Sequence, residues 1–147
     1  MKTVQKSVLI WYSAQEMFAL VAAVDQYPEF LPWCDRAAIL EQDEQGMTAE
    51  VGISISGIRQ SFTTRNTHTP GERIDMKLVK GPFSQLNGQW RFVPVAGDPG
   101  QRACKVEFQL DYGFDNRALA ALVGPVFDKI AGTLVDAFVK RAEQVYG

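Results

Sequence analysis

The side chains in this sequence of 147 residues that could act as a nucleophile or as a general base form no recognisable catalytic arrangement. The only histidine, His68, lies in the stretch TTRNTHT beside a turn, and no Ser/His/Asp arrangement surrounds it. We therefore expect His68 to be a solvent-exposed residue at the end of a strand. Cys34 could be a nucleophile, but nothing in the sequence supplies a base for it, so we expect a buried or half-buried thiol. The sequence predicts no catalytic set.

The sequence also argues against a metal site, a phosphate-binding loop and a disulfide scaffold. One histidine and two cysteines, Cys34 and Cys104, do not form a zinc cluster, and we expect both thiols to be reduced. The stretch GDPG at 97–100 lacks the lysine and the spacing of a P-loop, and Asp43-Glu44 is typical of a solvated turn. The net charge of −2 lowers the expectation of DNA binding. No metal and no required cofactor are predicted.

The length of 147 residues predicts a single domain over 1–147. The hydrophobic fraction of 46% and the charged fraction of 22% are typical of a soluble globular protein. Basic residues precede an apolar run at the N-terminus, but Gln15 and Glu16 interrupt that run, which argues against a signal peptide. No run approaches the ~20 apolar residues of a membrane helix. We expect a cytoplasmic protein.

The elements that would position these side chains begin with a strand and a helix. Apolar residues share one parity over 4–12, as in a strand with one apolar face. The stretch SAQE at 13–16 is a capping box, which marks a helix start. The helix should end near 25–27, because Pro28 disfavours helical geometry in the preceding residue. Pro28 could itself start a second short helix.

The remaining chain shows two further patterns. Apolar and polar residues alternate in short stretches up to Tyr112, with turn signals between them, one of them at 97–100; this predicts an antiparallel meander with one apolar face. From Leu119 onward, helical spacing predicts a long amphipathic helix with Asp115 or Asn116 as its N-cap. Gly124-Pro125 lies inside this helix and predicts a kink or break.

This order of elements predicts an α+β fold in which a curved antiparallel sheet wraps around the long C-terminal helix. The inner side chains could pack as a solid core or leave a ligand cavity between sheet and helix, and both readings stay open. Two features favour a cavity. The break at Gly124-Pro125 is an unfavourable local choice of the kind often found at functional sites. Phe83 lies in a turn, where it could anchor the turn or line a pocket mouth.

Three motifs, in order, resemble the coenzyme Q-binding, START-like family of the polyketide cyclase and lipid-transport superfamily. They are VDQYPEFLPWC at 24–34, KGPF with LNGQWRF at 80–92, and the C-terminal stretch 116–147 with GPVF and VDAF. The resemblance covers essentially the whole chain. It implies the helix-grip fold of START and Bet v 1-like proteins, with two short helices after the first strand. It also implies a hydrophobic tunnel for ubiquinone, another isoprenoid quinone or another lipid.

This resemblance implies several functions on one fold. The first is a carrier or chaperone of a hydrophobic ligand that supports respiration, with at most transient membrane contact. The family also includes bacterial ribosome-association toxins, which implies binding to the large ribosomal subunit as an alternative. Cyclase-type enzyme activity is the weakest alternative, because the sequence shows no catalytic set.

The predicted tunnel lining combines the inner sheet face, the long helix and the stretch after the first helix. Within that stretch Phe30, Leu31 and Trp33 would form a lid or mouth, and Tyr27, Trp90 and Tyr112 could offer hydrogen bonds to a quinone head. The complete set is Tyr27, Phe30, Leu31, Trp33, Phe62, Met76, Leu78, Phe83, Leu86, Trp90, Phe108, Tyr112, Leu122, Val126, Phe127 and Ile130.

A ribosome-binding surface would instead lie on the outer sheet face. The basic residues that could gather there are Arg59, Arg65, Arg73, Lys77, Arg91 and Lys105. Acidic residues are interleaved with them, so an ordinary solvated face is the other interpretation.

Overall fold

The computed structural model of the chain describes residues 2–55, 57–95 and 102–147. The predicted turn at 97–100 lies outside these residues. The described elements follow one another in this order: β1 (Lys2–Ile10), α1 (Ala14–Ala22), the 3-10 helix η1 (Val24–Glu29), β2 (Cys34–Asp43), β3 (Gly46–Ile55), β4 (Ile58–Thr69), β5 (Arg73–Lys80), β6 (Phe83–Pro94), β7 (Cys104–Phe114) and α2 (Arg117–Tyr146).

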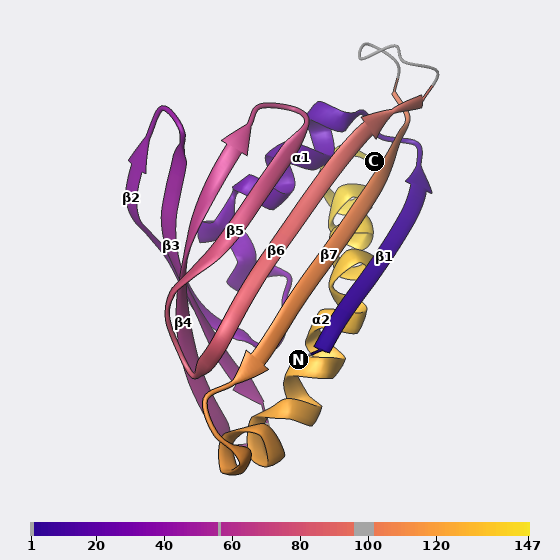
Figure 1. Cartoon of the computed structure of the whole chain (residues 1–147). Coiled ribbons are helices and arrows are strands. Elements are labelled where there is room, and N and C mark those ends of the chain that lie inside the picture. Colours follow the sequence, from indigo (N-terminus) through magenta and orange to yellow (C-terminus); the bar gives the residue numbers. More distant parts are fainter. Residues whose placement is uncertain (1, 56, 96–101) are drawn as a thin grey trace.

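The strands form one curved sheet in the order β1-β7-β6-β5-β4-β3-β2, and each neighbouring pair is antiparallel. The helix α2 runs along the concave side of this sheet, and α1 and η1 lie on the same side (Figure 1). This arrangement confirms the predicted α+β helix-grip fold, in which a curved sheet wraps around the C-terminal helix.

The alternation in the strands sets which side chains face α2. On β6, Leu86, Trp90 and Phe92 are buried, whereas their neighbours Gln85 and Arg91 are exposed. The inner rings form a connected aromatic cluster with α2, in which Trp90 lies 5.3 Å from Phe138 between ring centroids. Such edge-to-face contacts add to the burial of apolar area, so the cluster fixes the helix against the sheet.

The first helix begins as predicted but ends early. The side chain of Ser13 accepts a hydrogen bond from the backbone N–H of Glu16, and the Glu16 carboxylate accepts one from the N–H of Ser13, which completes the capping box. However, α1 ends at Ala22, and Pro28 lies inside η1 rather than at its start. Both expectations were wrong because the chain already leaves α-helical geometry at Ala23, where ψ is 65°.

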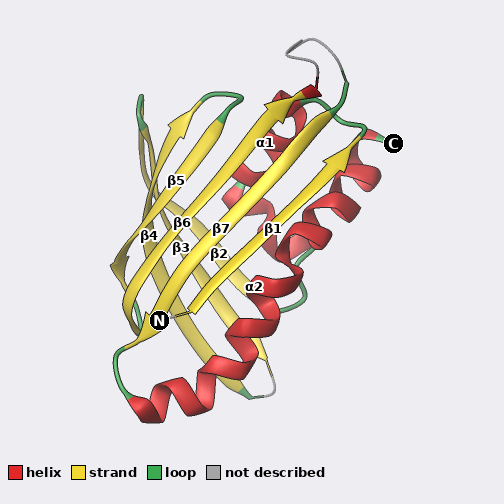
Figure 2. Cartoon of the chain, turned by 45° about the vertical axis from the view of Figure 1, so that its right-hand side comes forward, coloured by secondary structure: helices red, strands yellow, loops and turns green. Residues whose placement is uncertain are grey.

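The helix α2 is continuous through Pro125, so no break occurs at this position. Its first turns nevertheless run in a different direction from the rest of the helix, which is the bend that an internal proline produces (Figure 2). Asn116 caps the helix by accepting a hydrogen bond from the N–H of Leu119 at 2.8 Å, as predicted.

The helix α2 contains an 18-residue stretch with a mean hydropathy of 1.6, so by length and composition alone it could cross a membrane, although charged residues interrupt its apolar runs. Core helices of soluble proteins have the same composition. Here Val123, Phe127, Ile130 and Phe138 are buried against the sheet, which accounts for the apolar stretch.

Candidate ligand-binding cavity

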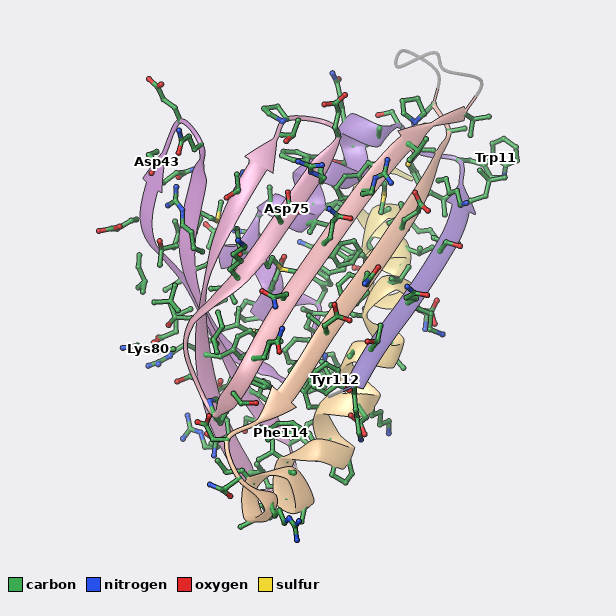
Figure 3. All side chains as sticks on the ribbon, in the orientation of Figure 1. Trp11, Asp43, Asp75, Lys80, Tyr112 and Phe114 are labelled. Atoms are coloured by element: carbon green, nitrogen blue, oxygen red, sulfur yellow. The ribbon has the colours of Figure 1, made fainter. Side chains whose placement is uncertain are left out.

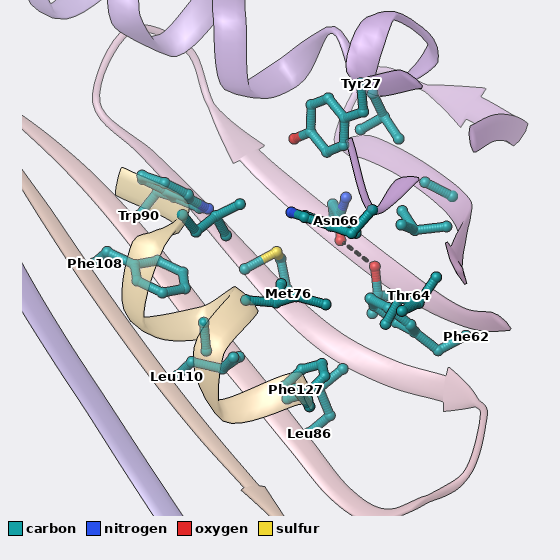
Figure 4. A pocket seen from close by; sticks show the side chains of 18 of the residues that line it. Tyr27, Phe62, Thr64, Asn66, Met76, Leu86, Trp90, Phe108, Leu110 and Phe127 are labelled. Atoms are coloured by element: carbon teal, nitrogen blue, oxygen red, sulfur yellow. Dashed lines mark hydrogen bonds between the residues drawn. The ribbon is translucent and has the colours of Figure 1, made fainter. Parts of the chain in front are cut away.

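A cavity of about 90 Å³ remains between the sheet and α2. Its walls come from η1, Trp33 directly before β2, the inner faces of β3 to β7 and one face of α2 (Figure 4). Most of the lining side chains are aliphatic or aromatic. The complete lining is Val24, Tyr27, Trp33, Ala49, Val51, Ile53, Phe62, Thr64, Asn66, Met76, Leu86, Trp90, Phe108, Leu110, Phe127, Ile130, Ala131, Leu134 and Phe138.

Nine of the predicted lining residues lie in these walls: Tyr27, Trp33, Phe62, Met76, Leu86, Trp90, Phe108, Phe127 and Ile130. The other seven do not line the cavity: Phe30, Leu31, Leu78, Phe83, Tyr112, Leu122 and Val126. Both groups come from the same strands, helices and motifs, so the difference arises from how each side chain packs.

Leu122 is the clearest error, because it is 58% exposed on α2 and points away from the sheet. Leu31 is buried in a second apolar cluster with Cys34 and Met47. Phe83 is an anchor rather than a mouth residue, since its ring lies 5.0 Å from that of Phe127. Leu31 and Phe83 therefore contribute to the packing of the interior without lining the cavity.

Sequence reasoning missed ten lining residues: Val24, Ala49, Val51, Ile53, Thr64, Asn66, Leu110, Ala131, Leu134 and Phe138. Several follow the same alternation as the predicted set and could have been found from it. Ala49 and Ala131 carry no signal of a binding site in the sequence, because small side chains contribute to a cavity only through the space that they leave. Thr64 and Asn66 were missed because they are polar.

Thr64 and Asn66 form the polar part of the cavity wall. They lie two residues apart on the inner face of β4, and Thr64 Oγ1 donates a hydrogen bond to Asn66 Oδ1 at 2.7 Å (Figure 4). The side chains are 6% exposed in both residues. A buried hydroxyl and amide are costly unless they are paired, so this pair is a specific feature of an otherwise apolar wall.

The cavity wall has little capacity for proton transfer. Among the described residues that line it, none is Asp, Glu, Lys, Arg, His or Cys. Tyr27 is the titratable one, and burial raises its pKa far above the ordinary value. Its hydroxyl donates a hydrogen bond to the carbonyl oxygen of Val21. Tyr112, also predicted to bind a quinone head, does not line the cavity. Its hydroxyl donates a hydrogen bond to the carboxylate of Asp128.

His68 is half-buried and not solvent-exposed, contrary to the prediction. It follows Thr64 and Asn66 on the inner face of β4, and its ring packs edge-on against Phe18 of α1 at 5.5 Å. The Nε2 atom is buried without a hydrogen-bond partner among the described residues. Burial lowers the pKa of His68, and Arg65 lowers it further, so the ring is held neutral.

The two cysteines are buried and free, as predicted. Burial raises the pKa of both thiols to about 11, which keeps them protonated at neutral pH. Among the described residues, no three His, Cys, Asp or Glu side chains lie close enough together to hold a metal ion.

The stretch after α1 forms one end wall of the cavity and is attached to α2. The rings of Tyr27 and Phe30 contact Phe138 at 5.4 and 5.3 Å. Arg141 of α2 places its guanidinium 5.0 Å from the centre of the Phe30 ring and 3.5 Å from the Glu29 carboxylate. Phe30 therefore covers the wall from outside, while Tyr27 and Trp33 reach the cavity.

The opposite wall contains a flexible element. An ideal Cβ atom at Gly88 would lie 2.5 Å from Cε of Met76 and 3.1 Å from Cδ1 of Leu110. The end of the Met76 side chain therefore occupies the space that a side chain at position 88 would take. Because methionine is unbranched and adaptable, this wall can change shape more easily than its aromatic surroundings.

The six basic residues predicted for a ribosome-binding surface all lie on the outer sheet face, although most are paired with acidic side chains. Arg65 contacts both oxygens of Asp43 at 2.8 Å, and Arg73 lies 2.9 Å from Asp75. Asp43 and Asp75 are labelled in Figure 3. Arg59 and Lys105 are paired in the same way, with Asp35 and Glu107. Lys77 and Arg91 belong to none of the ion pairs between described residues.

A family model described as polyketide cyclase/dehydrase and lipid transport matches residues 10–139 of the chain. The chain belongs to this family. A START superfamily protein from Mycobacterium smegmatis has the same fold, with a TM-score of 0.80 over 97% of this chain and 98% of that one, at 21% identity.

Two proteins that are similar to this chain have different names. The ribosome association toxin RatA of Vibrio cholerae is 45% identical over 147 residues, which span 100% of this chain and 99% of the toxin. The mitochondrial coenzyme Q-binding protein COQ10 homolog B of Xenopus laevis is 26% identical over 97% of this chain and 58% of that protein. The chain is thus similar over its full length to a protein named for ribosome association.

Proposed function

We propose that the protein binds a hydrophobic molecule in the cavity between sheet and α2, as a carrier or chaperone and not as an enzyme. The ligand we favour is an isoprenoid quinone such as ubiquinone. The observation that supports this proposal is a cavity wall of aliphatic and aromatic side chains with one polar pair, Thr64 and Asn66. Ligand pockets of proteins have this composition.

The absence of acidic, basic and thiol groups from the described lining supports binding over chemistry. A general acid or base works best with a pKa near the operating pH, and the raised pKa of Tyr27 is far from it. Retention of a ligand needs no reactive group. Each buried methylene contributes about 0.8 kcal/mol, so an isoprenoid tail can be held by burial alone.

The size of the cavity indicates that loading requires the walls to move. Its volume of about 90 Å³ is well below the roughly 300–1,000 Å³ of most ligand pockets. Met76 can move from its place over Gly88, and the stretch containing Tyr27 and Trp33 can separate from Leu134 and its neighbours on α2. We propose that a ligand enters between this stretch and α2, where the lining residues are only half-buried.

The test is to extract the purified protein with organic solvent and analyse the lipids by mass spectrometry. Short-tailed ubiquinone is then titrated into ligand-free protein, with fluorescence quenching of Trp33 and Trp90 as the signal. Ala131→Leu should fill the cavity and weaken binding, whereas Ala121→Leu on the exposed face of the same helix should not. An empty protein that also fails to bind added quinone would refute the proposal.

We propose ribosome association as a second candidate, on the basis of the full-length similarity to RatA. The outer face offers one supporting feature. Arg65 lies directly opposite Lys77, and Arg73 lies directly opposite Arg91 on neighbouring strands. Since Arg65 and Arg73 are paired with Asp43 and Asp75, the charges of Lys77 and Arg91 are the ones that phosphate groups of ribosomal RNA could bind. Because this face is opposite the cavity, the two functions are compatible.

Sedimentation with ribosomal subunits tests this candidate. The double variant Lys77→Glu/Arg91→Glu should reduce co-sedimentation with the large subunit, and raised salt should have the same effect on the wild type. The matched control is Lys129→Glu/Lys140→Glu, which reverses two exposed charges on α2. Equal loss in both double variants, or no co-sedimentation of the wild type, would refute binding through the outer face.

A further inference from the structure

The polar pair in the cavity wall leaves one of its groups unused. Asn66 is 6% exposed, and its Oδ1 atom accepts the hydrogen bond from Thr64. Its amide nitrogen donates none of the hydrogen bonds found between the described residues. In the two neighbouring strands the residues in register with Asn66 are Met47 and Met76, which offer no strong acceptor.

An unpaired amide donor in an apolar wall is a costly arrangement for stability alone. The fully buried side-chain atoms that lack a partner among the described residues are Thr63 Oγ1 and His68 Nε2, so the Asn66 amide nitrogen keeps accessible surface in the cavity wall. A valine and a leucine at positions 64 and 66 would fill the same wall without this cost. The presence of Asn66 is therefore better explained by a contact to a bound ligand than by the stability of the fold.

The hydroxyl groups of Tyr27 and Thr64 are not available as hydrogen-bond donors to a ligand, because each already donates within the protein. The Tyr27 hydroxyl donates to the carbonyl oxygen of Val21, and the Thr64 hydroxyl donates to Asn66. The amide nitrogen of Asn66 is thus a free donor in the polar part of the wall. A free donor selects a ligand with an acceptor oxygen.

We infer that Asn66 is a specificity-determining residue, whose amide nitrogen donates a hydrogen bond to a carbonyl oxygen of the bound ligand. The ligand class is an apolar molecule that carries a ketone or quinone oxygen, held in the polar part of the wall. Thr64 is a positioning residue, since its hydrogen bond to Oδ1 orients the amide. The inference deepens the proposed ligand binding and rests on it.

Acetophenone, 1-phenylethanol and ethylbenzene test this inference, because they are alike in shape and carry a carbonyl, a hydroxyl or no oxygen. Single-ring molecules suit a small cavity. Their dissociation constants are measured by NMR titration of the wild type, of Thr64→Val/Asn66→Leu, and of the control Thr67→Val. Thr67 is exposed on the same strand and does not line the cavity.

The expected result is a change in preference without a loss of folding. The ratio of the ethylbenzene to the acetophenone dissociation constant should fall about 2- to 10-fold in the double variant, which is the effect of one neutral hydrogen bond. Comparing this ratio between the wild type and the double variant cancels the different hydration of the two free ligands. Thr67→Val should leave it unchanged. The double variant should be at least as stable as the wild type, because both partners of the pair are replaced by apolar groups.

Two outcomes would overturn the inference, and they can be told apart. If both ligands bind and the ratio is the same in wild type and double variant, or if 1-phenylethanol is the ligand that loses affinity, Asn66 does not donate to a carbonyl and cavity binding itself stands. If none of the three ligands binds the wild type in the cavity, the proposed ligand binding fails together with the inference.

Discussion

Replacing Gly88 with alanine should reduce ligand affinity by acting through Met76. The new Cβ atom would lie 2.5 Å from Cε of Met76, which is closer than real Cβ contacts allow. The methionine end is the part that can yield, and the cavity that Met76 lines is the space available to it. Leu110, whose Cδ1 would lie 3.1 Å away, has to yield much less.

The size of the effect follows from the space that is lost. If the displaced methyl group of Met76 removes room for one ligand methylene, binding weakens by about 0.8 kcal/mol, or roughly fourfold. The free energy of unfolding should change little. Gly→Ala stabilises by about 0.4–1 kcal/mol through the unfolded chain, whereas overpacking costs about 1–3 kcal/mol. The overpacking cost should be at the low end of this range, because the flexible Met76 side chain can move.

The assay is quenching of Trp33 and Trp90 by short-tailed ubiquinone, in a Trp11→Phe background because Trp11 is 77% exposed and would add a constant signal. Gly88→Ala/Met76→Leu should restore binding, since leucine is too short to reach over residue 88. The control is Gly132→Ala, where an added Cβ meets nothing within 4 Å. Unchanged affinity in Gly88→Ala, or failure of Met76→Leu to restore it, would refute the role of Met76.

Three further predictions concern the attachment of the cavity wall, the buried histidine and the helix face. Arg141→Ala removes the contacts to Glu29 and Phe30, so stopped-flow fluorescence quenching should show faster ligand entry and release. The free energy of unfolding should change by no more than about 1 kcal/mol. The control Lys140→Ala should leave both rates unchanged. The pKa of His68 is lowered in the folded state, so the unfolded chain binds more protons. Urea unfolding should therefore show that the free energy of unfolding falls as the pH drops through about 6.5. His68→Leu should remove this pH dependence, and the same dependence in both proteins would contradict the prediction. Phe127→Ala should cost about 3–5 kcal/mol, because its ring is buried among other aromatic rings, while Leu122→Ser on the exposed face should stay within about 0.5 kcal/mol.

The order of elements could be predicted from the sequence because it depends on local signals. The capping box at 13–16, the alternation in the strands and the N-cap Asn116 each act over a few residues, and each is present in the structure. The helix ends and breaks predicted from proline positions were less reliable. Pro28 and Pro125 lie inside helical segments, since neighbouring packing tolerates the loss of a hydrogen bond that would end an isolated helix.

The cavity depended on tertiary structure. The alternation of apolar and polar residues correctly placed residues such as Trp90 and Phe108 on the inner face of the sheet. It could not distinguish side chains that line the cavity from Phe83, which is buried in the core beside the cavity. That difference is set by the curvature of the sheet and by the rotation of α2, which exposes Leu122 and buries Phe127. Neither quantity is encoded in a local pattern.

The sequence by itself determined the family, the fold and the apolar character of the interior, because motifs and periodicity survive without knowledge of distances. Only the folded structure decided that Tyr27 and Trp33 reach the cavity while Phe30 covers its wall, and that Asn66 has an unused donor there. The physical reason is that an empty space and an unpaired hydrogen bond are relations between residues far apart in the chain, which exist only after packing.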